Sequence, residues 1–371
     1  MTVAHNPRVL AIATVLPPHV CTREQSLQIA RQVFADQPEP LAFVERLLTA
    51  SGIEQRHTVI ADYGRPMEER TFFPRTHDFR PEPTTQARNA LFDRESRVLA
   101  RQACEALAPS PWRDRVTHLV TASCTGFAAP GYDIALARAL GLSPRVHRTQ
   151  VGFMGCYAGF STLKLAQALC KADPSALVLV VHVELCSLHV HFRADADTLI
   201  ANSLFADGVA AALIGGERHQ ELGQGTALAI QGAGAFLLPN GEEDMTWTLG
   251  DHGFHMTLSP RVPHLLHKHL PVAFTTLLQE LGVEREQIRH WAIHPGGPAI
   301  LDKAVKALGI AESDVAIARD VLRTCGNMSS ATLWFLLDRI RREPRAGLVY
   351  ACGFGPGLTL ESALLVHPGG P

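Results

Sequence analysis

The order of strands, turns and helices that this sequence predicts occurs twice along the chain, and this repetition constrains the fold more than any other feature. Ala139-Leu-Gly-Leu142 returns as Ala307-Leu-Gly-Ile310, and Gly155-Cys156 corresponds to Gly326-Asn327, 171 residues further on. Few residues are identical between the two stretches, so the repeat lies in the order of the elements. We therefore predict a duplicated chain whose equivalent turns meet at a shared axis.

The fold class follows from the alternation of strands and helices within each half. We expect one half to span residues 1–220 and the other residues 221–371. Such alternation predicts an α/β fold with largely parallel sheets covered by helices. Buried strands are predicted at 116–122, 176–183 and 209–214 in the first half. In the second half they are predicted at 289–293 and 347–351, and a last strand is predicted to end at residue 366.

Three segments interrupt this plan. Residues 62–95 are polar and rich in Pro, Arg and Phe, which predicts an irregular surface loop or the wall of a substrate channel, and a helix is expected from 93 to 107. Residues 245–258 predict a hairpin with a glycine near its turn. Residues 353–357 predict a glycine-rich turn. Because no helix follows this turn, a phosphate-binding loop is less favoured than a cavity wall.

The composition excludes several classes of function. The chain has 371 residues, with 34 Lys and Arg against 36 Asp and Glu, so it lacks the basic excess of a nucleic-acid-binding protein. No apolar run reaches the ~18 residues of a membrane span, and residues 1–8 lack a secretory pattern. The eight cysteines form no C-x-x-C pair, which predicts reduced thiols and a cytoplasmic location. The scattered histidines have no acidic or cysteine partner at ligand spacing, so no metal is expected.

Cys156 is the candidate nucleophile. It follows Gly155 and precedes the small residues Ala158 and Gly159, directly before a helical pattern over 161–170. A helix that begins near a cysteine directs unpaired N–H groups and the positive end of its dipole at the sulfur, which favours the thiolate. The alternative is a buried structural cysteine, which is the common case for free cysteines.

His294 and Asn327 are the candidate partners of this cysteine. His294 ends the predicted strand 289–293, and ligands of α/β sheets bind at the carboxyl ends of strands. Its imidazole could accept the thiol proton, although a histidine in such a position is often structural. Asn327 begins a helical region, where it could cap the helix or, with His294, stabilise an enolate or thioester oxyanion.

Several motifs together resemble the type III polyketide synthases, the chalcone and stilbene synthase family, and the chain is similar to its bacterial members in particular. The resemblance covers at least residues 116–367, and the N-terminal region adds Ser51-Gly-Ile-Glu-Gln-Arg56. The motifs that carry it are Met154-Gly-Cys-Tyr-Ala-Gly159, Leu204-Phe-Ala-Asp-Gly208, His294-Pro-Gly-Gly-Pro-Ala-Ile300, Gly326-Asn-Met-Ser-Ser-Ala331 and Gly353-Phe-Gly-Pro-Gly-Leu-Thr359.

The resemblance implies a thiolase-like fold with αβαβα layers, working as a homodimer. It implies that Cys156 takes an acyl group from acyl-CoA, and that His294 and Asn327 hold malonyl-CoA while it decarboxylates and extends the acyl chain. It also implies that no metal or other cofactor is needed. Further candidate substrate-binding residues are Thr125, Val190, Phe205, Met256, Gly353, Phe354, Gly355 and Pro356, with Arg56 as the candidate contact to the coenzyme A phosphates.

Departures from the family pattern suggest which starter is used. Counted from Glu184, the gatekeeper position that is aromatic in plant members falls on Val190, and a second one falls on Met256. Phe160 stands where many members have a small residue, and Cys352 where many have Phe. Because Val and Met are slimmer or more adaptable than Phe, we predict an aliphatic, long-chain acyl starter. The expected product is an alkylpyrone, a resorcinol or a phloroglucinol.

Three rival functions share this chemistry or this fold. An initiating ketoacyl synthase would use the same Cys156, His294 and Asn327 for one condensation onto an acyl carrier protein, but usually shows Gln-Ala-Asn after the histidine. A hydroxymethylglutaryl-CoA synthase would need a glutamate base, and none stands out in a motif. A non-catalytic scaffold would be expected to lack part of the triad, which is intact here.

Overall fold

The computed structural model describes residues 6–107, 111–223 and 225–369, so the first five residues, for which we predicted no secretory signal, lie outside it. The strands are β1 (Arg8–Val15), β2 (His19–Thr22), β3 (Gln55–Thr58), β4 (His118–Ser123), β5 (His147–Gly152), β6 (Leu177–Leu185), β7 (Asp207–Gly215), β8 (Leu228–Leu237), β9 (Met245–Gly250), β10 (Gly253–Leu258), β11 (Ile288–Ile293), β12 (Gly347–Gly355) and β13 (Thr359–His367). The α-helices are α1 (Arg23–Val33), α2 (Pro38–Ala50), α3 (Thr85–Glu105), α4 (Tyr132–Ala139), α5 (Ala158–Ala172), α6 (Ala196–Leu204), α7 (Val262–Leu281), α8 (Pro298–Leu308), α9 (Ala316–Cys325) and α10 (Thr332–Ile340).

The duplication is confirmed by the topology of the main sheet, whose strand order is β11-β12-β13-β8-β1-β7-β6-β4-β5. In the first half, β6 lies between a parallel β4 and an antiparallel β7, which pairs with β1. In the second half, β12 lies between a parallel β11 and an antiparallel β13, which pairs with β8. The two sets meet where Arg8 and Val9 pair with Ala229 and Leu228. Within the described residues, β5 has no counterpart in the second half.

The prediction of largely parallel sheets is wrong. In the main sheet only β4–β5, β4–β6 and β11–β12 pair in parallel, and the other pairs are antiparallel. The connections explain the difference. The turn Pro356–Leu358 joins β12 to β13, and a parallel pair would need a crossover of a dozen or more residues.

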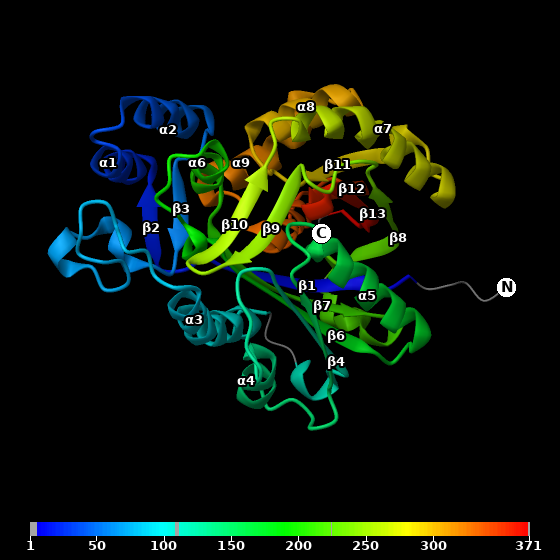
Figure 1. Ribbon diagram of the computed structural model, residues 1–371. Coiled ribbons are helices and arrows are strands. Elements are labelled where there is room, and N and C mark those ends of the chain that lie inside the picture. Colours follow the sequence, from blue (N-terminus) through cyan, green and yellow to red (C-terminus); the bar gives the residue numbers. More distant parts are fainter. Residues whose placement is uncertain (1–5, 108–110, 224, 370–371) are drawn as a thin grey trace.

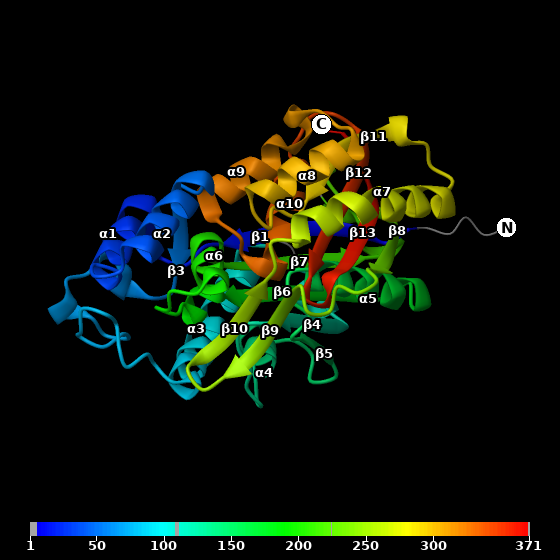
Figure 2. The same cartoon turned by 45° about the horizontal axis from the view of Figure 1, so that its top comes forward.

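The helices form three layers with the two parts of the sheet between them (Figures 1 and 2). Helices α3 and α4 cover the first-half strands, and α7 and α8 cover the second-half strands. Helices α5 and α10 lie between the two parts and touch strands of both. Eight of the nine residues of α10 are buried. This is the αβαβα layering that the resemblance implied.

Two predicted boundaries need correction. Helix α3 begins at Thr85 and not near residue 93, because the Thr84 Oγ1 accepts a hydrogen bond from the Ala87 N–H and the first turns bury Leu91 and Phe92. The irregular excursion therefore covers residues 62–84. The predicted glycine turn at 353–357 also differs, since Gly353 and Gly355 belong to strand β12.

Two features build the approach to the site. The predicted hairpin is confirmed as β9 and β10. The two strands pair antiparallel, with Met245 opposite Leu258 at one end and Gly250 opposite Gly253 at the other, and they cross the face seen in Figure 1. Helices α1 and α2 pack together against α6, a helix that the sequence reasoning missed. These three helices share a small apolar core of Ala30, Phe34, Val44, Leu48 and Leu199.

Candidate active site

Cys156 lies in the turn between β5 and α5, at the start of a buried helix. Gly155 precedes it with φ at +78°, and a Cβ there would meet the Pro356 ring at 2.3 Å, so the turn requires glycine. Helix α5 begins at Ala158, three residues before the predicted start, and no side chain caps it. Cys156 is therefore held beside uncapped N–H groups at a helix start, as the sequence predicted.

Asn327 reaches the same sulfur from the second half. The side chains of Asn327 and Ser329 both hydrogen-bond to the Cys156 thiol. The Asn327 Oδ1 accepts from the Ser329 N–H at 2.9 Å, so its Nδ2 is the group that faces the thiol. The other contact of Nδ2, to the Gly296 carbonyl, is long at 3.5 Å, which leaves this second N–H available to an oxygen in the cavity.

His294 directly follows strand β11, at the strand end where it was predicted. Its backbone N–H donates to the Cys352 carbonyl at 2.8 Å, and its ring meets the Phe354 ring edge to face at 5.9 Å between centroids. The residue is 2% exposed. Neither ring nitrogen has a hydrogen-bond partner in the described part of the chain. A buried imidazole without partners is poised for a ligand, because burying unpaired polar atoms is costly.

A single cavity of about 320 Å³ brings the three predicted residues together. Cys156, His294 and Asn327 all line it, and Phe205, Met256 and Phe354 form part of its wall. These side chains come from six separate stretches of the chain. The convergence that the duplicated fold predicted is therefore present in the structure.

The two central groups are both neutral in this arrangement. Burial raises the pKa of the Cys156 thiol to about 12, although hydrogen bonds from Ser329 and Asn327 oppose the shift. Burial lowers the pKa of His294 to about 4. The sequence led us to expect a thiolate favoured by the helix start. The cost of burying a charge outweighs that effect.

A second, narrower cavity meets the first at Cys156. The predicted residues Thr125, Val190 and Pro356 line the second cavity, together with Met256 and Phe205, which line both. Trp247 and Phe254 also line it and were missed by the sequence reasoning. Phe254 stands two residues before Met256 on β10, so the two-residue period of a strand places both on one face. The wall thus keeps aromatic side chains despite Val190 and Met256.

The glycines of β12 serve close packing beside the site. A Cβ at Gly353 would lie 2.7 Å from the Phe160 ring and 3.3 Å from the Cβ of His294. A Cβ at Gly355 would lie 2.8 Å from the Tyr157 ring and 3.2 Å from the Cys156 nitrogen. The glycines let the strand approach the catalytic backbone, while Phe354 and Pro356 face the two cavities.

Three more residues singled out in the sequence lie around the cavities. The Arg56 guanidinium donates to the carbonyls of Asn202 and Phe205 and to the Ser26 Oγ, so it supports the cavity wall, and its contact to a coenzyme A phosphate stays a prediction. Phe160 is 1% exposed and packs against Gly353 rather than crowding the turn after Cys156. The backbone carbonyl of Cys352 accepts a hydrogen bond from the backbone N–H of His294.

Glu184 is a buried acid close to the site. In the sequence it served only as the residue from which the gatekeeper position was counted. Its carboxylate accepts from the Cys124 N–H at 3.1 Å and from the hydroxyls of Thr125 and Ser330. Burial raises its pKa to about 7 despite these hydrogen bonds. The signal in the sequence is an acidic residue near the end of the apolar run of β6, where every position is buried.

The layered fold and the converging cysteine, histidine and asparagine define a thiolase-like condensing enzyme. Comparison with protein families gives the particular family. The profile described as "Chalcone and stilbene synthases, N-terminal domain" matches residues 2–218, and the corresponding C-terminal profile matches residues 229–369. The chain belongs to the chalcone and stilbene synthase family and is a type III polyketide synthase, a condensing acyltransferase. This membership decides against the rival functions.

Individual relatives agree with this assignment. The chain is 36% identical over 293 residues to the "Alpha-pyrone synthesis polyketide synthase-like Pks18" of Mycobacterium tuberculosis, covering 77% of this chain and 75% of that protein. Its structure superimposes on PKS-I of the brown alga Ectocarpus siliculosus with a TM-score of 0.89, at 29% identity, covering 98% and 99% of the two chains. The C-terminal type III polyketide synthase domain of Steely1 from Dictyostelium gives a TM-score of 0.88 at the same identity and coverage.

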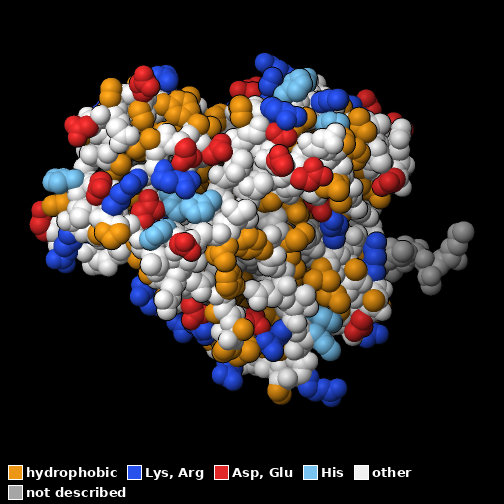
Figure 3. Space-filling model, in the orientation of Figure 1, with side chains coloured by type: hydrophobic (Ala, Val, Ile, Leu, Met, Phe, Trp, Pro, Cys, Tyr) orange, Lys and Arg blue, Asp and Glu red, His pale blue; other side chains and the backbone are white. Residues whose placement is uncertain are grey.

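The structure adds two findings on ligand classes. Among the described residues, none of the helices combines the length and apolarity needed to cross a bilayer, and no group of His, Cys, Asp and Glu could hold a metal ion. Acidic and basic side chains are mixed over the face drawn in Figure 3, in line with the near-neutral net charge of −2.

Proposed function

We propose that this enzyme loads a long aliphatic acyl group onto Cys156, extends it with malonyl-CoA, and cyclises the product to an alkylpyrone, a resorcinol or a phloroglucinol. The observation that carries the proposal is the position of Cys156 where two cavities meet. One cavity holds His294 and Asn327, and the other leads away from them along Val190. A growing chain and a malonyl unit could then approach the sulfur from different sides.

Loading requires removal of the thiol proton. The neutral His294, which has both ring nitrogens buried and unpartnered, can accept this proton as acyl-CoA enters. The sulfur then attacks the thioester carbonyl, the new C–S bond forms, and the coenzyme A thiolate leaves with a proton.

Extension uses the same residues on malonyl-CoA. An N–H of His294 and the Nδ2–H of Asn327 would hold the thioester oxygen while the bond to the carboxylate breaks and CO₂ leaves. The resulting enolate carbon attacks the acyl-Cys156 carbonyl, which forms a C–C bond and returns the sulfur as a thiolate. Two preorganised donors in a closed cavity stabilise the developing oxyanion far better than water does.

The starter class follows from a third, outer pocket. It is narrow, about 80 Å³, lies between α1, α2 and α6, and has Val190 in common with the lining of the second cavity. Its walls include Ile29, Val33, Phe34, Val44 and Leu199, which suit an alkyl chain. The relative Pks18 is named for alpha-pyrone synthesis, which agrees with a lactone formed from a short poly-β-keto chain.

Several further expectations stay predictions. We propose acyl-CoA and malonyl-CoA as substrates, no additional cofactor, a cytoplasmic location, and two halves that divide near residues 220 and 221. We also propose a homodimer. Its support is the edge strand β5, which is mostly exposed, and the neighbouring Phe127 and Phe153, which are 49% and 41% exposed. An exposed edge strand beside apolar side chains is typical of an interface.

A starter panel tests the proposal. Purified enzyme is mixed with malonyl-CoA and acetyl-, hexanoyl-, dodecanoyl-, palmitoyl- or p-coumaroyl-CoA, and the products are identified by mass spectrometry. We expect the largest kcat/KM for the long aliphatic starters and multiply extended products. Val190→Phe should reduce long-chain turnover by narrowing the passage, whereas Val272→Phe, at a 52% exposed position on α7, should not. Turnover of the aromatic starter alone would refute the proposal.

A further inference from the structure

The wall between the second cavity and the outer pocket is one short segment. Val190, His191, Asn202 and Phe205 line both cavities. The first two belong to residues 186–192, which follow β6 as a 3-10 turn and an extended stretch. Their position decides whether a passage joins the second cavity, which holds Cys156, to the outer pocket, and how wide that passage is.

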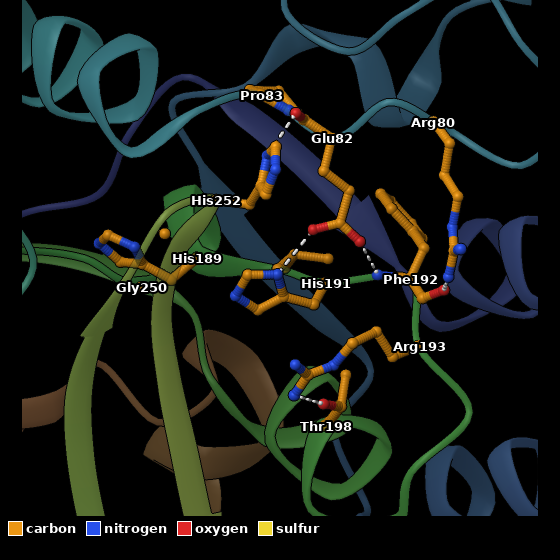
Figure 4. A network of polar contacts seen from close by, with 12 residues as sticks. Arg80, Glu82, Pro83, His189, His191, Phe192, Arg193, Thr198, Gly250 and His252 are labelled. Atoms are coloured by element: carbon orange, nitrogen blue, oxygen red, sulfur yellow. Dashed lines mark hydrogen bonds and ion pairs between the residues drawn. The ribbon is translucent and has the colours of Figure 1, made fainter.

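Side chains from residues 80–88 hold this segment by its backbone. The Glu82 carboxylate accepts from the Phe192 N–H at 2.7 Å, and Arg80 donates to the Phe192 carbonyl at 3.2 Å (Figure 4). Arg88, whose side chain is fully buried, donates to the carbonyls of Leu188 and Val190. The hydrogen bonds come from the polar excursion and from the first turn of α3, which the sequence marked as irregular.

His191 lies between two hydrogen-bond acceptors in this arrangement. Its Nδ1 lies 2.6 Å from the Glu82 carboxylate and its Nε2 lies 3.0 Å from the Phe254 carbonyl. The ring therefore links the Glu82 side chain to the backbone of strand β10. Burial raises the pKa of Glu82, but the hydrogen bonds from His191 and Phe192 and the nearby charges bring it below its usual range.

The pair is buried and joined to the rest of the wall. The side chains of Glu82 and His191 are 10% and 6% exposed, and Arg88 lies 3.3 Å from the same carboxylate. The His191 carbonyl accepts from the Asn202 amide at 2.6 Å, and the Asn202 carbonyl accepts from Arg56. Removing one partner from such a buried charged network leaves the others unpaired, which is strongly unfavourable.

We propose that the Glu82–His191 pair is a specificity determinant that keeps the passage from Cys156 to the outer pocket open for long acyl chains. The pair draws residues 188–192 away from the apolar pocket. Without it, Val190 and its neighbours move into that pocket, because burying apolar side chains is favourable. Glu82 acts as a positioning residue through His191 and touches neither cavity. The inference rests on the proposed long-chain starter.

The test compares Glu82→Gln with the wild type across acetyl-, hexanoyl-, dodecanoyl- and palmitoyl-CoA. We expect kcat/KM for dodecanoyl- and palmitoyl-CoA to fall about tenfold or more, through KM, because misplacement of a wall by about 1 Å has effects of this order. Turnover of acetyl-CoA should change less than about twofold. Glu221→Gln, which removes the partner of Arg115 far from the cavities, is the matched control.

A double variant separates positioning from a general loss of structure. In the Glu82→Gln background, His191→Gln should add little to the long-chain loss, because interacting residues are not additive. An unchanged chain-length profile in Glu82→Gln, or an equal loss with every starter, would overturn the proposal. If Glu82→Gln does not yield folded protein, Glu82→Asp decides by the same criterion with a smaller expected loss. A wild-type enzyme that rejects all aliphatic starters would instead refute the proposed function.

Discussion

In the first half the buried helix α5 begins beside Cys156, and in the second half the equivalent helix α10 follows Asn327 and Ser329. The strands around both helices have the same order and the same directions. One copy of the plan thus supplies a nucleophile, and the other supplies hydrogen-bond donors to the same sulfur. Duplication provides a rigid frame, and the residues that differ between the copies provide the chemistry.

The halves also differ in what surrounds this frame. Only the first half adds α1, α2, the excursion at 62–84 and the edge strand β5 within the described residues. In the second half His294 directly follows strand β11. In the first half Cys124 and Thr125 follow the equivalent strand β4. The comparison teaches that condensation chemistry is shared across the halves, whereas starter selection is expected to depend on the additions to the first half.

The largest effect is expected at the nucleophile of the first half. Cys156→Ala should lower condensation by at least about 1,000-fold, because no other group forms the acyl-enzyme. Cys170→Ala is the control, since that thiol lies on α5, the helix that follows Cys156, and its hydrogen-bond partners are the carbonyls of Ala176 and Ile214. Product formation and the mass of the acylated protein are measured. Retained chain extension in Cys156→Ala would refute the assignment.

A smaller effect is expected at the equivalent position of the second half. Asn327→Ala should lower decarboxylation of malonyl-CoA about 100-fold, as loss of one oxyanion donor does elsewhere. Acyl loading onto Cys156 should persist more fully, because the sulfur itself is unchanged. Released CO₂ and acyl-enzyme are measured side by side, with Gln279→Ala on the surface of α7 as the control. An equal loss in both steps would contradict a role specific to the enolate.

The smallest effect concerns the ionisation of the Cys156–His294 pair. Burial raises the pKa of the thiol to about 12 and lowers that of His294 to about 4. The thiolate fraction of the free enzyme should therefore grow about tenfold for each pH unit between pH 7 and pH 10. Alkylation of Cys156 by iodoacetamide, followed by mass spectrometry, should rise in proportion. A rate that is already constant at neutral pH would indicate a thiolate–imidazolium pair instead.

Much of the site was predictable because its residues sit at recognisable places in the chain. Glycine before Cys156, a strand ending at His294 and a Gly-Asn pair before a helix are local patterns, and the repeat indicated that they meet. The predicted hairpin at 245–258 and the two-half organisation of the sheet also hold. These features depend on hydrophobic periodicity and backbone preferences, which act over a few residues.

Other features depend on contacts between residues far apart in the sequence. The sheet is mixed in part because β1 pairs antiparallel with the distant strands β7 and β8, and helix α3 begins early in part because Leu91 and Phe92 are buried. Trp247 and Phe254 line the cavity because of the way the hairpin lies on the body of the protein. None of these could be derived from local pattern alone.

The sequence by itself determined which residues we propose for the chemistry, since Cys156, His294 and Asn327 each stand in a motif of a few residues. Only the tertiary structure decided their charge states and the shape of the space around them. Burial of Cys156 and His294 holds both neutral, and Glu82 with His191 fixes the wall of the passage. The physical reason is that desolvation and cavity shape are properties of packing, which brings together side chains that the sequence keeps more than a hundred residues apart, such as Glu82 and His191 (|i−j| = 109).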